Sequence, residues 1–265
     1  MNYESDFYAL IDSGQVSIER KSVESVKDNC LRFTDGSCLQ TDAIVHCGGW
    51  KWTRPILFHG LDYAAMGLPK KLGSEPLDSE VWARLREQMD KEVLHSIPDL
   101  RSAPPGPSRA HHNAYCTNAD DDGESYTPWC LHRTIAPLNQ VCEDSVRTLA
   151  FTGLFSTLPT AALAEIQALW AIAFLHHKTI PNFTSESAME QAVLWSRWNR
   201  LRYPYSHASQ FMDTAYAILP YFDILLADMG LRSRRKTTWW KELWEPYGAA
   251  DYKGLVEEFK ARWDM

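Results

Sequence analysis

Apolar residues recur at helical spacing along much of the chain. Val81, Leu85, Met89 and Val93 stand four residues apart, which places them on one face of a helix over residues 79–94. A second helix is predicted over residues 160–177, before Pro181, from steps of three and four between apolar residues. Its stripe consists of Leu163, Ile166, Leu169, Trp170, Ala173 and Phe174. Both stripes are typical of helices that cover a protein core.

Further helices are predicted around these two. A short one over residues 6–12 ends before Gly14, and others cover residues 185–201, a segment from Ser209 onward, and residues 252–263. Pro220 suits the first turn of a helix that Gly230 ends. The pattern therefore predicts a large helical C-terminal half.

Short apolar runs between turn residues predict strands. Residues 43–47, rich in Ile and Val and followed by Gly48-Gly49, are typical of a strand buried on both faces. Residues 30–39 predict two short strands around an Asp35-Gly36 turn. Further strands are expected at residues 16–19, 127–137 and 148–153. Together with the helices, they give an α/β (α+β) fold class.

The composition allows one large domain. The chain has 265 residues, 45% of them hydrophobic, with 11 Trp, 11 Tyr and 10 Phe, enough for a sizeable core and an aromatic pocket. We expect a single domain over residues 1–265, with a sheet-containing part at 1–157, a long loop at 98–126 and a helical part at 158–265. The net charge of −7 disfavours nucleic acid as a partner.

Signals for secretion and membrane insertion are not expected. No run of about 18 apolar residues is present, so no membrane span is predicted. The first residues are neither basic nor apolar, unlike a signal peptide. We therefore expect a cytoplasmic protein whose six cysteines, which form no C-x-x-C motif, stay reduced.

Several motifs, in order along nearly the whole chain, resemble one enzyme family. They are TDAIVHCGGW at 41–50, LHRTIAP at 131–137, RTLAFTGL at 147–154, AEIQALW at 164–170, and the tail from Tyr221 to Glu258. This series is similar to the second half of flavin-containing monooxygenases of the fungal branch. The resemblance implies the remnant of a Rossmann-like FAD/NAD(P)-binding sheet. It also places Glu165 and Gln167 on a helix that packs beside the flavin in that family.

The nucleotide-binding fingerprints of that family are missing. Each is a G-x-G-x-x-G motif where a strand enters a helix, so that a pyrophosphate can sit on the helix N-terminus. None of the 13 glycines follows that spacing. We therefore expect neither FAD nor NADPH as a cofactor.

The long loop and the strand after it carry the chain's most concentrated polar chemistry. His111, His112, Cys116, Cys130 and His132 are of the types that hold zinc. Their spacing fits no standard zinc site, and the family resemblance already accounts for the last two. No metal is expected.

These observations favour a cofactor-free enzyme on an oxygenase scaffold that lacks the nucleotide-binding fingerprints. Its substrate would be an apolar secondary-metabolite intermediate, and its reaction a cyclisation or isomerisation such as a Diels–Alder reaction. The catalytic candidates are donors and proton carriers on or after the loop: His111, His112, Tyr126, His132 and Arg133. The candidates for substrate binding are Trp50, Trp129 and Trp170. A purely structural role, holding the loop in place, competes for each polar residue.

Two alternatives stay open. The chain could be a non-catalytic partner subunit that completes a split flavin-dependent monooxygenase, or an inert ligand carrier. Independently of this choice, Trp239, Trp240 and Trp244 are expected to pack over the core or rim a pocket. The expected partner is an apolar small molecule, with neither nucleic acid nor membrane, and a homodimer is left open.

Overall fold

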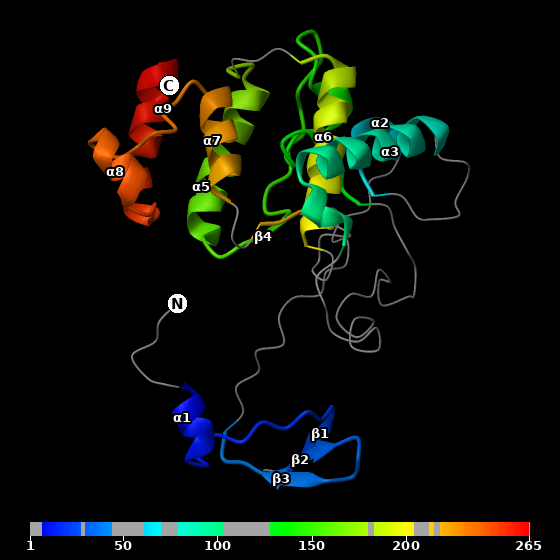
Figure 1. Ribbon diagram of the computed structural model, residues 1–265, viewed down its shortest axis with the longest axis vertical. Helices are drawn as coiled ribbons and strands as arrows, with labels where there is room; N and C mark the ends of the chain where they lie inside the picture. The colour runs from blue at the N-terminus through cyan, green and yellow to red at the C-terminus, as the bar shows by residue number, and fades with distance from the viewer. Residues whose placement is uncertain are drawn as a thin grey trace. The chain divides into compact units, whose positions relative to one another are not determined.

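The computed structural model describes residues 7–27, 30–43, 61–69, 79–102, 128–179, 183–203, 212–214 and 218–264. The chain divides into two compact units, residues 1–52 and residues 53–265, and each is described by itself. The mixed α/β class with a helical C-terminal half is confirmed (Figure 1). The single domain over residues 1–265 stays a prediction.

The first unit is a helix followed by a small antiparallel sheet. Helix α1 (Phe7–Asp12) precedes strands β1 (Val23–Lys27), β2 (Cys30–Phe33) and β3 (Cys38–Gln40), in the spatial order β1-β2-β3. The predicted turn between the last two strands is confirmed. Gly36 has a φ of 84°, and the backbone N–H of Ser37 donates to Asp35 Oδ1 at 2.8 Å.

Two strand predictions in this unit have different outcomes. The strand expected at residues 16–19 is wrong, because these residues follow the turn at Gly14 and pair with no strand; β2 pairs with Val23–Lys27 instead. The strand expected at residues 43–47 lies outside the described residues.

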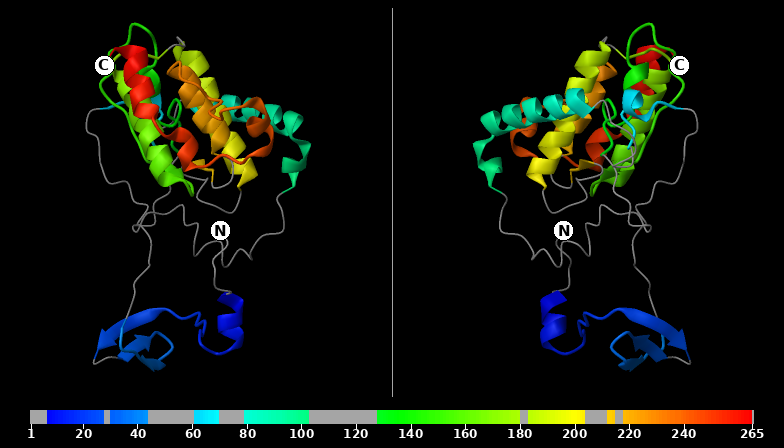
Figure 2. Two further views of the ribbon diagram at one scale, coloured as in Figure 1. Left: turned by 90° about the vertical axis from the view of Figure 1, so that its left-hand side faces the viewer. Right: turned by 90° about the vertical axis from the view of Figure 1, so that its right-hand side faces the viewer.

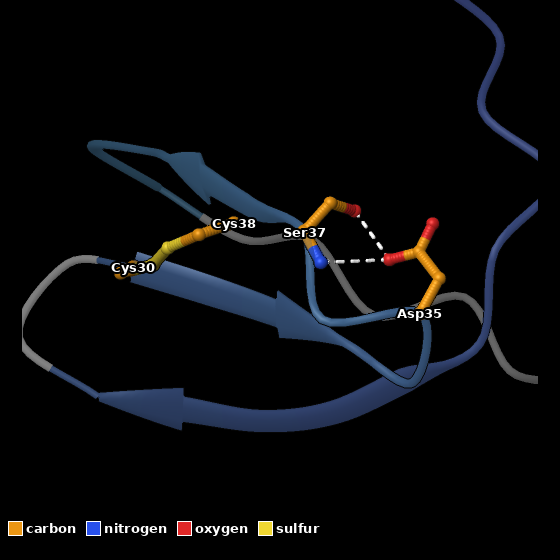
Figure 3. Close-up of a disulfide and its surroundings, with 4 residues drawn as sticks. All are labelled: Cys30, Asp35, Ser37 and Cys38. Atoms are coloured by element: carbon orange, nitrogen blue, oxygen red, sulfur yellow. Dashed lines mark hydrogen bonds between the residues drawn. A yellow bond between two sulfur atoms is a disulfide. The ribbon is translucent and has the colours of Figure 1, made fainter.

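Cys30 and Cys38 form a disulfide between β2 and β3 (Figure 3). They are diagonal neighbours, since Cys30 pairs with Gln40 and Cys38 with Arg32, and their Cα atoms are 6.2 Å apart. The expectation that all six cysteines stay reduced is therefore wrong for this pair. Among the described residues, Cys130 and Cys142 are free thiols.

The second unit is helical, and its helices confirm most of the predicted ones. Helix α3 (Ser79–Ser96) and helix α6 (Ser185–Arg202) pack against each other, as do α5 (Thr160–Leu175) and α7 (Leu219–Asp228) (Figures 1 and 2). Shorter elements are α2 (Tyr63–Met66), η1 (Pro98–Arg101), η2 (Leu138–Gln140), α8 (Trp239–Trp244), η4 (Ala249–Tyr252) and α9 (Leu255–Trp263).

Local sequence explains where these helices begin. Thr184 and Ser187 form a capping box at the start of α6, in which each side chain accepts from the other residue's backbone N–H. Pro220 lies in the first turn of α7, where its missing N–H costs no hydrogen bond. The helix expected from Ser209 falls largely outside the described residues, and residues 212–214 contain a strand.

The strands predicted at residues 127–137 and 148–153 are wrong. Residues 132–136 form a tight turn, and residues 148–153 belong to no strand, although the Phe151 N–H donates to Ile135 O at 2.8 Å. The strands that do occur there are two residues long: β4 (Phe155–Ser156) pairs in parallel with β5 (Met212–Asp213). Residues 142–145 form a polar turn.

The main core of the second unit is built on α5 and α7. Trp170, Phe174, Tyr221 and Phe222 are almost fully buried, with Leu255 of α9 beside them. Each such side chain contributes about 1.5–3 kcal/mol by leaving water. Along the described part of the chain, every helix is too short or too polar to cross a bilayer.

Helix α8 carries four exposed apolar side chains outside this core. Trp239, Trp240, Leu243 and Trp244 are 58–78% exposed. Trp239 and Trp240 stack on each other, with ring centroids 3.9 Å apart. The expectation that these tryptophans pack over the core or rim a pocket is therefore not met at α8.

Candidate functional site

A tight turn at residues 132–136 anchors the polar part of the second unit. Arg133 and Thr134 have φ values of 52° and 57°, a conformation that costs on the order of 1–3 kcal/mol for each such residue. The turn is held by two bonds at 2.9 Å, from His132 N–H to Ala136 O and from Ala136 N–H to His132 O. This geometry brings the Arg133 side chain to α6 and α7.

Arg133 is tied to Asp228 at the end of α7. Its Nε and Nη2 donate to the two Asp228 carboxylate oxygens at 2.7 and 3.1 Å, and its Nη1 donates to Gln191 Oε1 at 3.0 Å. Trp170 Nε1 donates to the same carboxylate at 3.0 Å. Asp228 is 3% exposed, so this is a buried, fully hydrogen-bonded ion pair.

Tyr221 joins this ion pair to α5. Its hydroxyl donates to the Arg133 carbonyl at 2.8 Å and accepts from Gln167 Nε2 at 2.9 Å. Gln167 Oε1 in turn accepts from the Gly153 N–H at 2.9 Å. Burial raises the pKa of Tyr221 well above its usual range, so the phenol stays neutral.

His132 lies next to this network without joining it. It is 1% exposed, and neither ring nitrogen has a hydrogen-bond partner. Its ring packs against Phe183 and Trp170, at centroid distances of 4.4 and 6.1 Å. Burial, with smaller effects from Arg133 and Arg147, lowers the pKa of His132 to about 3. The imidazole is therefore neutral at physiological pH.

Two cavities lie beside the network, and Trp195 of α6 lines both. The smaller, of about 10 Å³, has the room of one water molecule and is bordered by Arg133, Thr134, Gln191 and Tyr221. The larger, of about 370 Å³, is here named the α3–α6 cavity. Its described lining is Glu92, Val93, Ser96, Ile97, Leu194, Trp195, Trp198 and Pro220.

The α3–α6 cavity is lined mainly by apolar side chains, with Glu92 and Ser96 as its described polar residues. Val93 is buried, whereas Glu92, Ser96 and Ile97 are exposed, and these three residues are here called the mouth of the cavity. The indoles of Trp195 and Trp198 meet at 76°, with centroids 5.7 Å apart. Nearby, Arg197 of α6 and Asp90 of α3 form a bidentate ion pair at 2.6 and 2.7 Å, which joins the two helices.

The structure brings together part of the predicted site. Arg133 and Trp170 meet at Asp228, with His132 packed beside them. Trp129 lies apart, edge-on to Phe151 with centroids 5.4 Å apart. The remaining candidates fall outside the described residues: Trp50, His111, His112 and Tyr126.

Sequence reasoning missed the residues that complete the network and line the cavity. Asp228, Gln191 and Tyr221 lie on helices whose sequence pattern predicts only packing against a protein core. One available signal was Asp228, a carboxylate in the apolar segment of α7. A buried carboxylate requires a cationic partner.

The candidate zinc ligands do not converge where the structure describes them. Within those residues, no group of three or more His, Cys, Asp or Glu side chains is placed to hold a metal ion. Burial raises the pKa of the Cys130 thiol to about 11, so it is a thiol rather than a thiolate ligand at neutral pH. His111, His112 and Cys116 lie outside the described residues.

The described residues do not by themselves form a dinucleotide cradle. Such a cradle needs a glycine-rich turn from a parallel strand into a helix. The one strand that leads directly into a long helix here is β4, and the connection to α5 is Thr157-Leu158-Pro159, without glycine. Among the described elements, the larger sheet is antiparallel.

The chain is similar to several fungal enzymes. It is 30% identical over 265 residues to an FAD-dependent monooxygenase of Aspergillus sclerotiorum, covering 97% of this chain and 42% of the relative. Over 253 residues it is 29% identical to one of Aspergillus nomiae, covering 95% and 41%. A monooxygenase of Alternaria brassicicola is 24% identical over 261 residues, covering 96% and 41%.

These matches run along almost all of this chain but only part of each relative. The chain spans about two-fifths of the length of the curated relatives it matches. No family model matches it, and no solved structure matches it.

Proposed function

We propose, from the premise that this chain is a relative of fungal FAD-dependent monooxygenases, that it catalyses a cyclisation or isomerisation of an apolar secondary-metabolite intermediate without a cofactor. Such a reaction keeps every atom of its substrate, so it requires neither an oxidant nor an electron donor. In a Diels–Alder reaction, for example, two σ bonds and one π bond replace three π bonds.

The observation that carries this proposal is the α3–α6 cavity. Its volume of about 370 Å³ falls in the range of small-molecule sites, and its lining is mainly apolar and aromatic. A cyclisation is accelerated chiefly by holding a flexible substrate in the reactive fold. Trp195 and Trp198 meet edge-to-face at 76°, so a substrate chain lying against both indoles would follow the angle that they form.

Polar residues of the network have a supporting part in this proposal. Arg133 and Tyr221 border the small cavity that Trp195 also lines, and the Tyr221 ring lies edge-on to that indole with centroids 6.4 Å apart, which supports the position of the indole. The Arg133 guanidinium is occupied by Asp228 and Gln191, which suits it to positioning. His111, His112 and Tyr126 remain proposed catalytic residues, together with His132 and Arg133.

The test is a mass-resolved assay of the purified chain with the pathway's linear intermediate, without added flavin or NADPH. The expected product has the mass of the substrate. Trp195→Ala should lower turnover by roughly ten- to a hundredfold, because it removes a wall of the cavity. Trp239→Ala, on the exposed face of α8, is the matched control and should keep full turnover. A product heavier by one oxygen atom would contradict the proposal.

A second candidate is favoured by the surface of α8. In this alternative, the chain is a non-catalytic subunit that completes a split FAD-dependent monooxygenase. The occupant of the α8 face would be the polypeptide that carries the FAD domain, since this chain matches only 41–42% of the length of its relatives. Four exposed apolar side chains on one short helix are typical of an interface.

Co-expression separates the two candidates. The FAD-carrying region of the Aspergillus sclerotiorum relative is produced together with this chain, and the pair is purified through a tag on one of them. A stable, yellow complex that is lost in Trp240→Ala and Trp244→Ala favours the subunit. A failure to co-purify, with isomerase activity in the isolated chain, favours the enzyme.

A further inference from the structure

The α3–α6 cavity has one charged residue among its described lining residues, and that residue is Glu92. Glu92 lies on the last turns of α3 and is exposed at the mouth of the cavity. Within the described part of the chain, no ion pair involves it. The neighbouring acid Asp90 is different, because both of its oxygens are bound by Arg197.

The indoles of Trp195 and Trp198, together with the Glu92 carboxylate, are of the kinds that bind a cation. Aromatic faces attract cations through the negative face of the ring, and tryptophan does so most strongly. A carboxylate beside aromatic walls adds a direct ion pair to that attraction. Trp195, Trp198 and Glu92 line the same cavity, so a single bound molecule can meet all three.

We infer that the ligand of this cavity is an organic amine: an apolar body with a protonated nitrogen. The apolar body fills the space between Val93, Leu194 and the two indoles, and the ammonium group lies at the mouth against Glu92. Ser96, also at the mouth, offers a hydroxyl to the ammonium N–H. This inference rests on the proposed function for its site and adds the substrate class.

The basic residues of α3 and α6 lie outside the described lining of the cavity. On α3, Lys91 forms an ion pair with Glu87 at 2.8 Å. On α6, Arg197 is neutralised by Asp90 at 2.6 Å. Arg86 and Arg200 lie near the Asp90–Arg197 pair. Neither lysine nor arginine belongs to the described lining of the cavity. Among the described lining residues, Glu92 is therefore the charge that a ligand meets directly.

The test uses two probes of equal shape, 4-phenylbutylamine and 4-phenylbutan-1-ol, in ligand-observed NMR titrations at pH 7 with the full chain. The amine is protonated and the alcohol is neutral. We expect the amine to bind roughly tenfold more tightly, the sum of one ion pair and one cation–π contact. Glu92→Gln should bring the two affinities within about twofold, whereas the control Glu87→Gln should leave the ratio unchanged.

The outcomes keep this inference separate from the proposed function. Equal binding of both probes to the wild type, unaffected by Glu92→Gln but weakened by Trp198→Leu, overturns the amine class and leaves the apolar site in place. If neither probe binds, the cavity is not a ligand site, and both ideas fail. Glu92→Gln changes an exposed position conservatively, so a loss of folding does not obscure the result.

Discussion

At the scale of single residues, His132 makes the second unit sensitive to acid. Its pKa is lowered to about 3 in the folded chain, whereas the unfolded chain binds the proton near the usual value of about 6.5. The unfolded state therefore takes up more protons below pH 6.5, and the free energy of unfolding falls as the pH drops. Between pH 7 and pH 5, this amounts to about 2 kcal/mol.

The variant His132→Leu checks this dependence. Denaturant unfolding at pH 7 and pH 5 should show a smaller loss of stability in the variant than in the wild type, by up to about 2 kcal/mol. Carboxylates titrate in both proteins and cancel in the comparison. Equal pH dependence in the two would mean that His132 has a hydrogen-bond partner in solution.

The ion pair between Arg133 and Asp228 gives a second residue-scale prediction. Asp228→Ala leaves a guanidinium in a site where both side chains are at most 11% exposed. We expect a loss of about 3–5 kcal/mol of unfolding free energy, because the remaining charge is buried without a partner. Asp90→Ala breaks the similar pair with Arg197, whose side chains are 22% and 29% exposed, and should cost about 1 kcal/mol.

Thermal and denaturant unfolding of both variants measure this contrast. Similar losses in the two variants would indicate that water reaches Asp228 as readily as it reaches Asp90. Restoring charge neutrality with Arg133→Met in the Asp228→Ala background should recover part of the loss, since it removes the unpaired cation.

At the scale of elements, Gly67 ends α2 at a close backbone contact. Its φ is 75°, its carbonyl accepts from Cys130 N–H at 2.9 Å, and a Cβ at this position would overlap the carbonyl oxygen of Cys130. Gly67→Ala should therefore cost about 2–4 kcal/mol, from the left-handed conformation and the overlap together.

Gly153 provides a matched control for this substitution. Its φ is 81°, and a Cβ there would meet nothing within 4 Å. Gly153→Ala should cost about 1 kcal/mol, the conformational part alone. Equal costs at the two positions, measured by denaturant unfolding, would show that the connection from α2 to Cys130 adapts to the added methyl group.

Helices were predictable from the sequence to within a few residues, and strands mostly were not. The steps of three and four in α3 and α5, and Pro220 in α7, are local signals that packing then reinforces. The segment from residue 128 to 137 has the apolar content of a strand but forms a turn. Its left-handed residues, Arg133 and Thr134, are stabilised by contacts with α6 and α7, which no local pattern contains.

The candidate site was also predictable from the sequence only in part. Family resemblance and residue chemistry pointed to Arg133, Trp170 and Gln167, which the structure joins through Asp228 and Tyr221. The cavity was not predictable, because Trp195 and Trp198 become neighbours of Glu92 only when α6 packs on α3. A contact between segments so far apart in sequence leaves no periodic signal.

At the scale of the whole molecule, we expect a reductant to loosen the first unit, which contains the disulfide, and to leave the second unit unchanged. It closes a short loop in the first unit, with a sequence separation of 8. By the loop-entropy relation, such a crosslink contributes about 2.5 kcal/mol. Reduction should therefore speed amide hydrogen exchange in β1, β2 and β3 and leave α5 and α7 unchanged.

Cys30→Ser is the matching variant for this experiment. It should show the faster exchange of the first unit without reductant and no further change with it. A Cys130→Ser, Cys142→Ser variant keeps the crosslink and should respond as the wild type does. Faster exchange in α5 or α7 on reduction would contradict this expectation.

The stacked indoles of α8 also allow this helix to be followed by circular dichroism and fluorescence. The two indoles are in contact and their planes are inclined by 25°, so their electronic transitions couple, and Trp239 and Trp240 should contribute a paired positive and negative band to the circular dichroism spectrum. Their emission is open to dissolved iodide, whereas that of Trp170, which is 2% exposed, is shielded. Any molecule that covers α8 will therefore report its arrival by removing the quenching, without a label.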